Sequence, residues 1–195
     1  MKKPNPGVKR RTMGFFSTPI WRVEWSDNLQ LPDLESTVLR MMKDAPNGVV
    51  VSNCGGWQSP PGVFDQPEFK ALHARIQKEV TRINPRLKMT RGWANVNPPG
   101  TRNIVHIHPA CALSGVFYIA ANEKSGDIVF NDPRDVAIAV GGLPNFVSRP
   151  VPLKPKPGML LLFPSWLPHE VVENQSDTQR ISLAFNARLY APDLD

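Results

Sequence analysis

Three histidines have the residue type and spacing of metal ligands, namely His106, His108 and His169. Residues i and i+2 of a strand point to the same side, so His106 and His108 project together if residues 104–108 are extended. Neutral imidazole suits iron, and three ligands can occupy one face of an octahedron while the opposite face stays open. The alternative is a structural histidine pair. The pattern predicts a mononuclear metal site, from which His73 is excluded because it falls on the exposed side of a predicted helix.

A fixed cation and a hydroxyl follow the third histidine. Arg180 and Ser182 share one side of a predicted strand. The guanidinium group stays charged and forks onto carboxylates, and the serine hydroxyl can donate to the same carboxylate. A dicarboxylate could then chelate the metal at one end and be held by these residues at its other end. The alternative is an ordinary ion pair between Arg180 and a surface acid such as Glu173 or Asp177.

The elements that must position these side chains are two helices followed by many short strands. Apolar spacing predicts helices over residues 31–42 and 67–83. Strands are predicted at residues 15–25, 49–52, 87–96, 104–108, 113–120, 128–130, 136–140, 159–163, 170–172 and 180–189. Loops are expected at residues 53–62 and 144–158, which are rich in glycine or proline. This order predicts a mostly β domain with N-terminal helices, a double-stranded β-helix or jelly roll.

Length and charge indicate one domain with a basic extension. The chain has 195 residues, of which 41% are hydrophobic and 21 are prolines. The formal net charge is +6, but five basic residues and no acid stand among the first eleven, so the remainder is nearly neutral. We expect a flexible basic tail over residues 1–13 and a single domain over residues 14–195. Nucleic acid or an acidic partner could be contacted only by the tail.

Cysteine usage and hydropathy bear on location. The two cysteines, Cys54 and Cys111, form no Cys-x-x-Cys pair, and we expect them to be reduced, buried thiols of a cytoplasmic protein. No apolar stretch approaches the roughly 20 residues that a membrane span needs. No membrane association is therefore expected, and the sequence leaves the oligomeric state open.

The motifs His106-Ile107-His108-Pro109 and Arg180-Ile181-Ser182 resemble those of the iron(II)- and 2-oxoglutarate-dependent oxygenase superfamily, in particular a branch found in bacteria and phages. The resemblance spans roughly residues 15–190. Its further shared stretches are residues 52–53, 55–59, 93–95, 113–118, 125–126, 130–134, 157–158, 163–166 and 185–186, together with His169. The resemblance implies a double-stranded β-helix that uses Fe(II), 2-oxoglutarate and O2.

The resemblance also implies roles for the chemistry-bearing residues. His106 and His169 match the two iron-binding histidines, and Arg180 with Ser182 match the pair that holds the far carboxylate of 2-oxoglutarate. His108 stands where the family usually has Asp or Glu, so either it is a third neutral ligand or the iron has two histidine ligands only. The implied reaction is hydroxylation of a peptidyl side chain, an amino acid or a small metabolite, with release of succinate and CO2.

Further site residues are predicted by position. Candidates for contact with 2-oxoglutarate are Asn95, Ser114 and Tyr118. Candidates for the substrate pocket are Trp93, Arg134 and Trp166. Ordinary strand or core positions are the alternative for each of them. Two other functions stay open at this point: a three-histidine, cupin-type dioxygenase that does not use 2-oxoglutarate, and a non-catalytic jelly-roll binding module.

Overall fold

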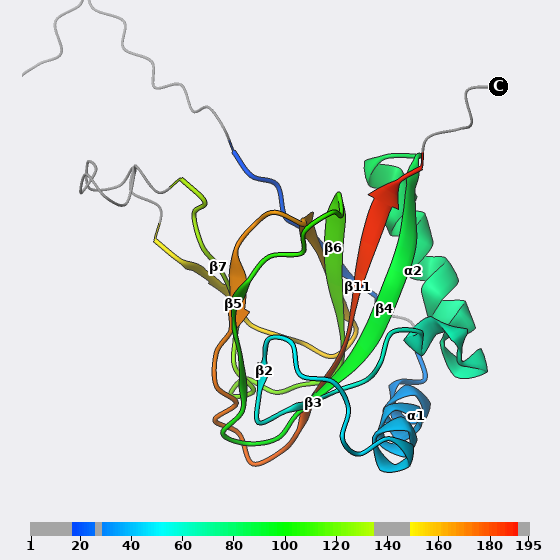
Figure 1. Cartoon of the computed structure of the whole chain (residues 1–195), viewed down its shortest axis with the longest axis vertical. Helices are drawn as coiled ribbons and strands as arrows, with labels where there is room; N and C mark the ends of the chain where they lie inside the picture. Colours follow the sequence, from blue (N-terminus) through cyan, green and yellow to red (C-terminus); the bar gives the residue numbers. More distant parts are fainter. Residues whose placement is uncertain (1–16, 26–28, 135–148, 191–195) are drawn as a thin grey trace, which may run out of the picture.

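Two antiparallel sheets face each other in the computed structural model, which describes residues 17–25, 29–134 and 149–190 (Figure 1). The six-stranded sheet contains, in spatial order, β1 (Trp21–Glu24), β9 (Met159–Pro164), β6 (Leu113–Ala120), β11 (Arg180–Leu189), β4 (Leu87–Asn97) and β3 (Trp57–Gln58). The five-stranded sheet contains β2 (Asn53–Cys54), β5 (Arg102–His106), β10 (His169–Val171), β7 (Ile128–Phe130) and β8 (Val151–Leu153). This arrangement confirms the expected jelly roll.

The helices cover one side of the six-stranded sheet. They are α1 (Leu31–Asp44), the 3-10 turns η1 (Val63–Asp65) and η2 (Pro67–Phe69), and α2 (Lys70–Ile83). The apolar stripe Leu72, Ile76 and Val80 of α2 is buried in the main core. Figure 1 shows α1 and α2 beyond β4, on the side away from β5 and β7. The helices therefore leave the space between the two sheets free for a site.

Alternation along β11 separates the core from that space. Ile181 and Leu183 are fully buried in the core beneath the helices. Arg180, Ser182 and Asn186 point the other way and line a cavity between the sheets. A strand places neighbouring side chains on opposite faces, so one strand serves both the core and the cavity.

The segment before β3 differs from the prediction. Residues 49–52 form no strand, and the predicted loop 53–62 contains β2 and β3. The reason is local, because the Asn53 carboxamide accepts a hydrogen bond from the Val51 amide at 2.9 Å and donates to the carbonyls of Val49 at 3.2 Å and Gly56 at 2.8 Å. Side-chain bonds of this kind hold the backbone in a turn instead of a ladder.

Other strands also differ from the prediction in their bounds. The strand β5 covers residues 102–106 and stops before His108, and β10 begins at His169, one residue earlier than predicted. The strand β8 lies inside the predicted loop 144–158, where Pro152 is tolerated because β8 is the edge of its sheet. Of the predicted strand 15–25, the structure forms Trp21–Glu24. The predicted strand at residues 136–140 and the tail at residues 1–13 lie outside the described residues.

Both cysteines are free, but the expectation that they are buried is wrong: Cys54 is exposed and Cys111 is half-buried. Cys54 pairs with Arg102 at the short outer strand of its sheet, where the side chain meets solvent. None of the helices in the described part of the chain has the length and apolar character that a membrane crossing requires.

Candidate metal centre and co-substrate pocket

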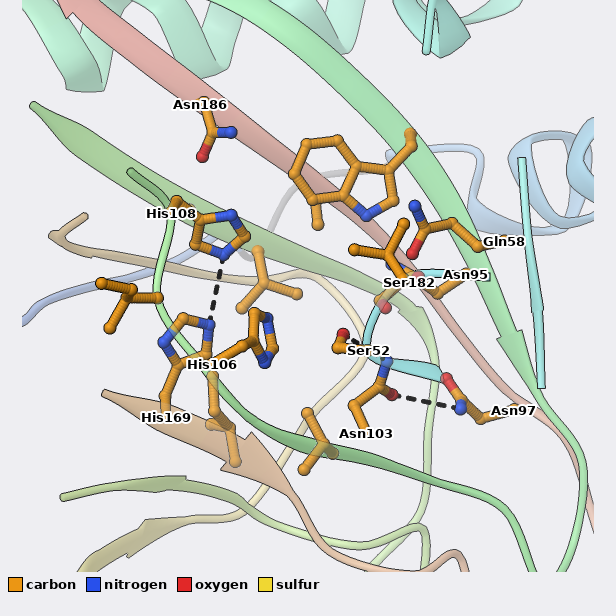
Figure 2. Close-up of a pocket in the computed structure, with 18 of the residues that line it drawn as sticks. Ser52, Gln58, Asn95, Asn97, Asn103, His106, His108, His169, Ser182 and Asn186 are labelled. Atoms are coloured by element: carbon orange, nitrogen blue, oxygen red, sulfur yellow. Dashed lines mark hydrogen bonds between the residues drawn. The ribbon is translucent and has the colours of Figure 1, made fainter. Parts of the chain in front are cut away.

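The three predicted histidines come together on the five-stranded sheet. His106 is the last residue of β5 and His169 is the first residue of β10, and the two are register partners. His108 lies two residues past the end of β5, where its backbone amide donates to the Ser165 carbonyl at 2.9 Å. That bond ties the segment after β5 to the turn that precedes β10. The sheet and this tie together bring the three imidazoles into one cluster (Figure 2).

The ring nitrogens of the cluster are oriented for a cation. One candidate ligand atom from each histidine lies within 4.8 Å of the others. The Nδ1 atoms of His106 and His169 contact the backbone carbonyls of Ile104 at 2.7 Å and Leu167 at 2.9 Å. A carbonyl only accepts, so each Nδ1 carries the proton and each Nε2 presents its lone pair to the cluster. The His108 and His169 Nε2 atoms are 3.3 Å apart.

This geometry fits a transition metal held by neutral donors. Two nitrogens bound at right angles with bonds of about 2 Å lie about 3 Å apart, close to the observed separation of His108 and His169. Burial, followed by the effects of His169 and His106, lowers the pKa of the His108 imidazole to about 3. Burial, followed by the effect of His106, lowers the pKa of His169 to about 4, and burial lowers that of His106. All three rings are therefore neutral near pH 7, as ligands must be.

Arg180 faces the cavity from the six-stranded sheet with one nitrogen atom lacking a partner. The side chain is 1% exposed, and its Nη1 donates to the carbonyls of Ser125 at 2.5 Å and Gly126 at 3.2 Å. Its Nη2 is buried without a hydrogen bond in the described part of the chain. No ion pair between Arg180 and Glu173 or Asp177 is formed. A buried cationic donor without an acceptor indicates that an anion belongs there.

Polar side chains form a row beside Arg180. Ser182 of β11 is the register partner of Tyr118 on β6 and of Asn95 on β4, and Asn95 is in turn the partner of Gln58 on β3. All four side chains are buried and line the cavity. Burial raises the pKa of the Tyr118 phenol, which therefore stays protonated and can donate a hydrogen bond. Adjacent strands are about 4.8 Å apart, so the row spans about 14 Å.

The cavity has a volume of about 450 Å³ and lies between the two sheets. The histidine cluster stands on one wall, and Arg180 with the polar row stands on the other. Its described lining contains no aspartate or glutamate, and its only ionic side chains other than histidine are Arg91 and Arg180. Beside Arg180, a small network joins Asn97 to Asn103 at 3.3 Å and Asn103 to Ser52 at 3.2 Å (Figure 2). The described lining of the cavity is therefore free of acidic side chains and carries positive charge among apolar and neutral polar residues.

The remaining predicted site residues differ in whether they line the cavity. Trp93 lines the cavity, and its ring centroid is 5.7 Å from that of His108. The Ser114 hydroxyl donates to the Asn186 carboxamide at 2.8 Å. Arg134 pairs with Asp132 at 2.6 Å, and Trp166 is 51% exposed. Neither Arg134 nor Trp166 lines the cavity.

Several cavity residues were not predicted from the sequence, namely Ser52, Gln58, Arg91, Asn97, Asn103 and Asn186. A signal existed for some of them, because Ser52, Gln58 and Asn186 lie inside stretches that carry the family resemblance. Residues 125–126 are a shared stretch as well, and their carbonyls hold Arg180. Arg91, Asn97 and Asn103 had no such signal.

Solved structures that share the fold include prolyl hydroxylases and an α-ketoglutarate-dependent carbocyclase. A Pseudomonas putida prolyl-4-hydroxylase is similar with a TM-score of 0.67 and 17% identity, over 90% of this chain and 95% of that one. The α-ketoglutarate-dependent carbocyclase SnoK of nogalamycin biosynthesis gives 0.69 and 10%, over 89% and 80%. A Trichoplax adhaerens prolyl hydroxylase, solved with a hypoxia-inducible-factor peptide, gives 0.65 and 18%, over 87% and 83%. No curated protein sequence matches the chain.

Fold and site together define a jelly-roll protein in which a three-histidine cluster, able to hold a metal ion, faces a buried arginine across a cavity. Residues 91–186 match the family model described as "Putative 2OG-Fe(II) oxygenase". These residues form a 2OG-Fe(II) oxygenase domain region, as the sequence motifs predicted. The matched region begins at Arg91 and includes the three histidines, Arg180 and Ser182.

Proposed function

We propose that this protein is an Fe(II)- and 2-oxoglutarate-dependent dioxygenase that hydroxylates a peptidyl side chain, an amino acid or a small metabolite and releases succinate and CO2. The observation that carries the proposal is the buried, unpartnered Nη2 of Arg180, which shares a cavity with three converging imidazoles. Iron(II) bound with 2-oxoglutarate and O2 supplies the oxidising chemistry. The rest of the proposal concerns what the side chains do.

The proposed roles divide between the two walls. His106, His108 and His169 hold the metal through neutral nitrogens, and the carbonyls of Ile104 and Leu167 orient two of these rings. On the other wall, Arg180 receives the far carboxylate of 2-oxoglutarate. Beside it, the row of polar side chains offers further hydrogen-bonding groups to the co-substrate, namely the hydroxyls of Ser182 and Tyr118 and the carboxamide of Asn95. The apolar residues Val116 and Phe163 line the cavity between the walls and help to exclude water.

The test is anaerobic loading with Fe(II) and 2-oxoglutarate, followed by measurement of succinate after O2 is admitted. We expect the wild-type protein to produce succinate even without its prime substrate. We expect His169→Ala and Arg180→Ala to produce none. Metal binding with no binding of 2-oxoglutarate would instead support a three-histidine dioxygenase of the cupin type. Absence of metal binding would leave a non-catalytic module. Equilibrium binding of 2-oxoglutarate to the zinc-loaded protein separates these outcomes even without the prime substrate.

A further inference from the structure

A second group of anion-binding donors lies at the end of the cavity opposite to Arg180. Arg91 on β4 and Asn186 on β11 are register partners, and both line the cavity. Asn186 is six positions along β11 from Arg180, and a rise of about 3.3 Å per residue puts their Cα atoms about 20 Å apart. The five-carbon chain of 2-oxoglutarate spans only about 6 Å with bonds of about 1.5 Å. One molecule held at Arg180 therefore leaves Arg91 and Asn186 unoccupied.

The Asn186 carboxamide is fixed with its donor side free. The hydroxyl of Ser114, which is 1% exposed, donates to the Asn186 Oδ1 at 2.8 Å. The Nδ2 group of Asn186 has two N–H donors, and no partner for them is found in the described part of the chain. In Figure 2, Asn186 lies on the His108 side of the cavity, while Ser182 and Asn95 lie on the far side. These free donors are therefore near the metal end of the cavity and away from the polar row.

Strand alternation directs Arg91 toward the same place, beside a bulge. The β4–β11 register shifts between Asn186 and Ala187, so Arg91 faces Asn186 while Met89 faces Ala187 and Thr90 is the extra residue. The Thr90 hydroxyl donates to the Asn186 carbonyl at 3.3 Å. A bulge of this kind redirects side chains and is frequent beside active sites. Arg91 itself lines the cavity by the regular alternation that it shares with Trp93 and Asn95 on β4, and the bulge ends this regular pairing next to Arg91.

Charge supports an anion at this end. Arg91 makes no ion pair in the described residues, and the described cavity lining includes no acid to neutralise it. His108 replaces the acidic ligand that the family usually has, so three neutral histidines leave the metal's double charge to be balanced by 2-oxoglutarate alone. With Arg180 paired to the far carboxylate of 2-oxoglutarate, Arg91 is the cation of the described lining that is left without a counter-charge, and its exposure to solvent makes it accessible to an anionic group.

We propose that Arg91 and the Asn186 Nδ2 group form a substrate-binding subsite for an anionic group, a carboxylate or a phosphate, at the metal end of the cavity. This inference rests on the proposed function, because it assigns Arg180 to 2-oxoglutarate and Arg91 to the substrate. Ser114 is a positioning residue in it, because its hydroxyl determines which side of the Asn186 carboxamide faces the ligand. The substrate that this subsite implies carries a negative charge close to the carbon that reacts.

The experiment uses acetate and inorganic phosphate as probes. They are titrated into the full-length protein loaded with Zn(II) and 2-oxoglutarate, with tryptophan fluorescence as the signal and Trp93→Phe as the variant that identifies its source. We expect saturable binding that weakens at least tenfold in Arg91→Gln and Asn186→Ala. Arg188→Gln is the matched control, because it removes the same charge from β11 at an exposed position outside the cavity lining. It should change the affinity less than twofold.

The relative affinities of the two probes decide between a carboxylate and a phosphate. The subsite is overturned if neither probe saturates, if Arg91→Gln binds both as tightly as the wild type, or if Arg188→Gln weakens binding equally. It is also overturned if Arg91→Gln weakens 2-oxoglutarate binding as much as Arg180→Gln does. Failure of the proposed function looks different, because 2-oxoglutarate would then not bind while the probe titration, repeated without it, still reports on Arg91.

Discussion

The Nε2 atoms of His108 and His169 lie 3.3 Å apart, although His108 follows the end of β5 and His169 begins β10. Burial lowers the pKa of both imidazoles, so both rings are neutral near pH 7. The His169 Nε2 presents a lone pair to this gap because its Nδ1 donates to the Leu167 carbonyl, and the separation is close to that of two nitrogens bound at right angles to one metal ion. The separation therefore favours the interpretation of His108 as a third ligand over that of a bystander beside a two-histidine site.

Removing the His108 imidazole tests this relationship. We expect His108→Ala to weaken Zn(II) and Fe(II) binding by roughly tenfold or more, because one of three donors is lost. His108→Asp should restore or exceed the wild-type affinity, because it supplies an anionic ligand. Calorimetric titration of the metal-free protein measures both variants. Unchanged affinity in His108→Ala would mean that the site has two histidine ligands only.

The neutral histidines make the stability of the metal-free protein depend on pH. The folded-state pKa values of His108 and His169, about 3 and about 4, lie below the ordinary value of 6.5, so the unfolded chain takes up protons first as the pH falls. The free energy of unfolding is therefore unaffected by these two rings above about pH 6.5. Below that pH it falls progressively, by up to about 1.4 kcal/mol per pH unit for each ring. Urea unfolding at pH 7, 6 and 5 measures the trend. The double variant His108→Asn, His169→Asn should show a flatter dependence, and an equally steep one would refute this explanation.

Arg180 should affect the co-substrate more than the fold. Arg180→Met removes a buried cation whose Nη2 has no partner, so we expect little change in the melting temperature of the metal-free protein. The same change should abolish the increase in melting temperature that 2-oxoglutarate gives to the zinc-loaded protein, because the carboxylate loses its charged partner. Thermal unfolding with and without 2-oxoglutarate checks both expectations. An increase in melting temperature equal to that of the wild type would place the co-substrate elsewhere.

Gly126 is the residue that keeps the Arg180 guanidinium in place. It has a φ of +87°, and a Cβ atom there would stand 2.1 Å from the Val172 carbonyl oxygen and 3.0 Å from the Arg180 Nη1. We expect Gly126→Ala to destabilise the protein by about 1–3 kcal/mol and to weaken 2-oxoglutarate binding. Gly100→Ala is the matched control, since Gly100 has a φ of +79° and nothing within 4 Å. It should show backbone strain alone, with 2-oxoglutarate affinity intact. Equal loss of affinity in both variants would contradict a specific role for Gly126.

Much of the fold could be predicted because its signals are local. Residues 113–120 are a short apolar run that is buried on both faces, residues 180–189 alternate, and residues 31–42 and 67–83 have helical apolar spacing. The strand predicted at residues 49–52 was wrong because the apolar Val50 and Val51 are not packed in a sheet. They are 83% and 69% exposed, in a turn that the Asn53 side chain stabilises. The edge strand β8 was missed because proline is a poor strand signal except at an edge.

The sequence by itself determined the chemistry that is available, because residue type and spacing select three imidazoles, one arginine and one hydroxyl, and the family match includes them all. Tertiary structure alone decided how these groups are used. The carbonyls of Ser125 and Gly126 orient Arg180, the register of four strands aligns Gln58 with Tyr118, and the pairing of β4 with β11 places Arg91 opposite Asn186. Strand register and bulges set which distant residues become neighbours, and these pairings leave no period in the local sequence.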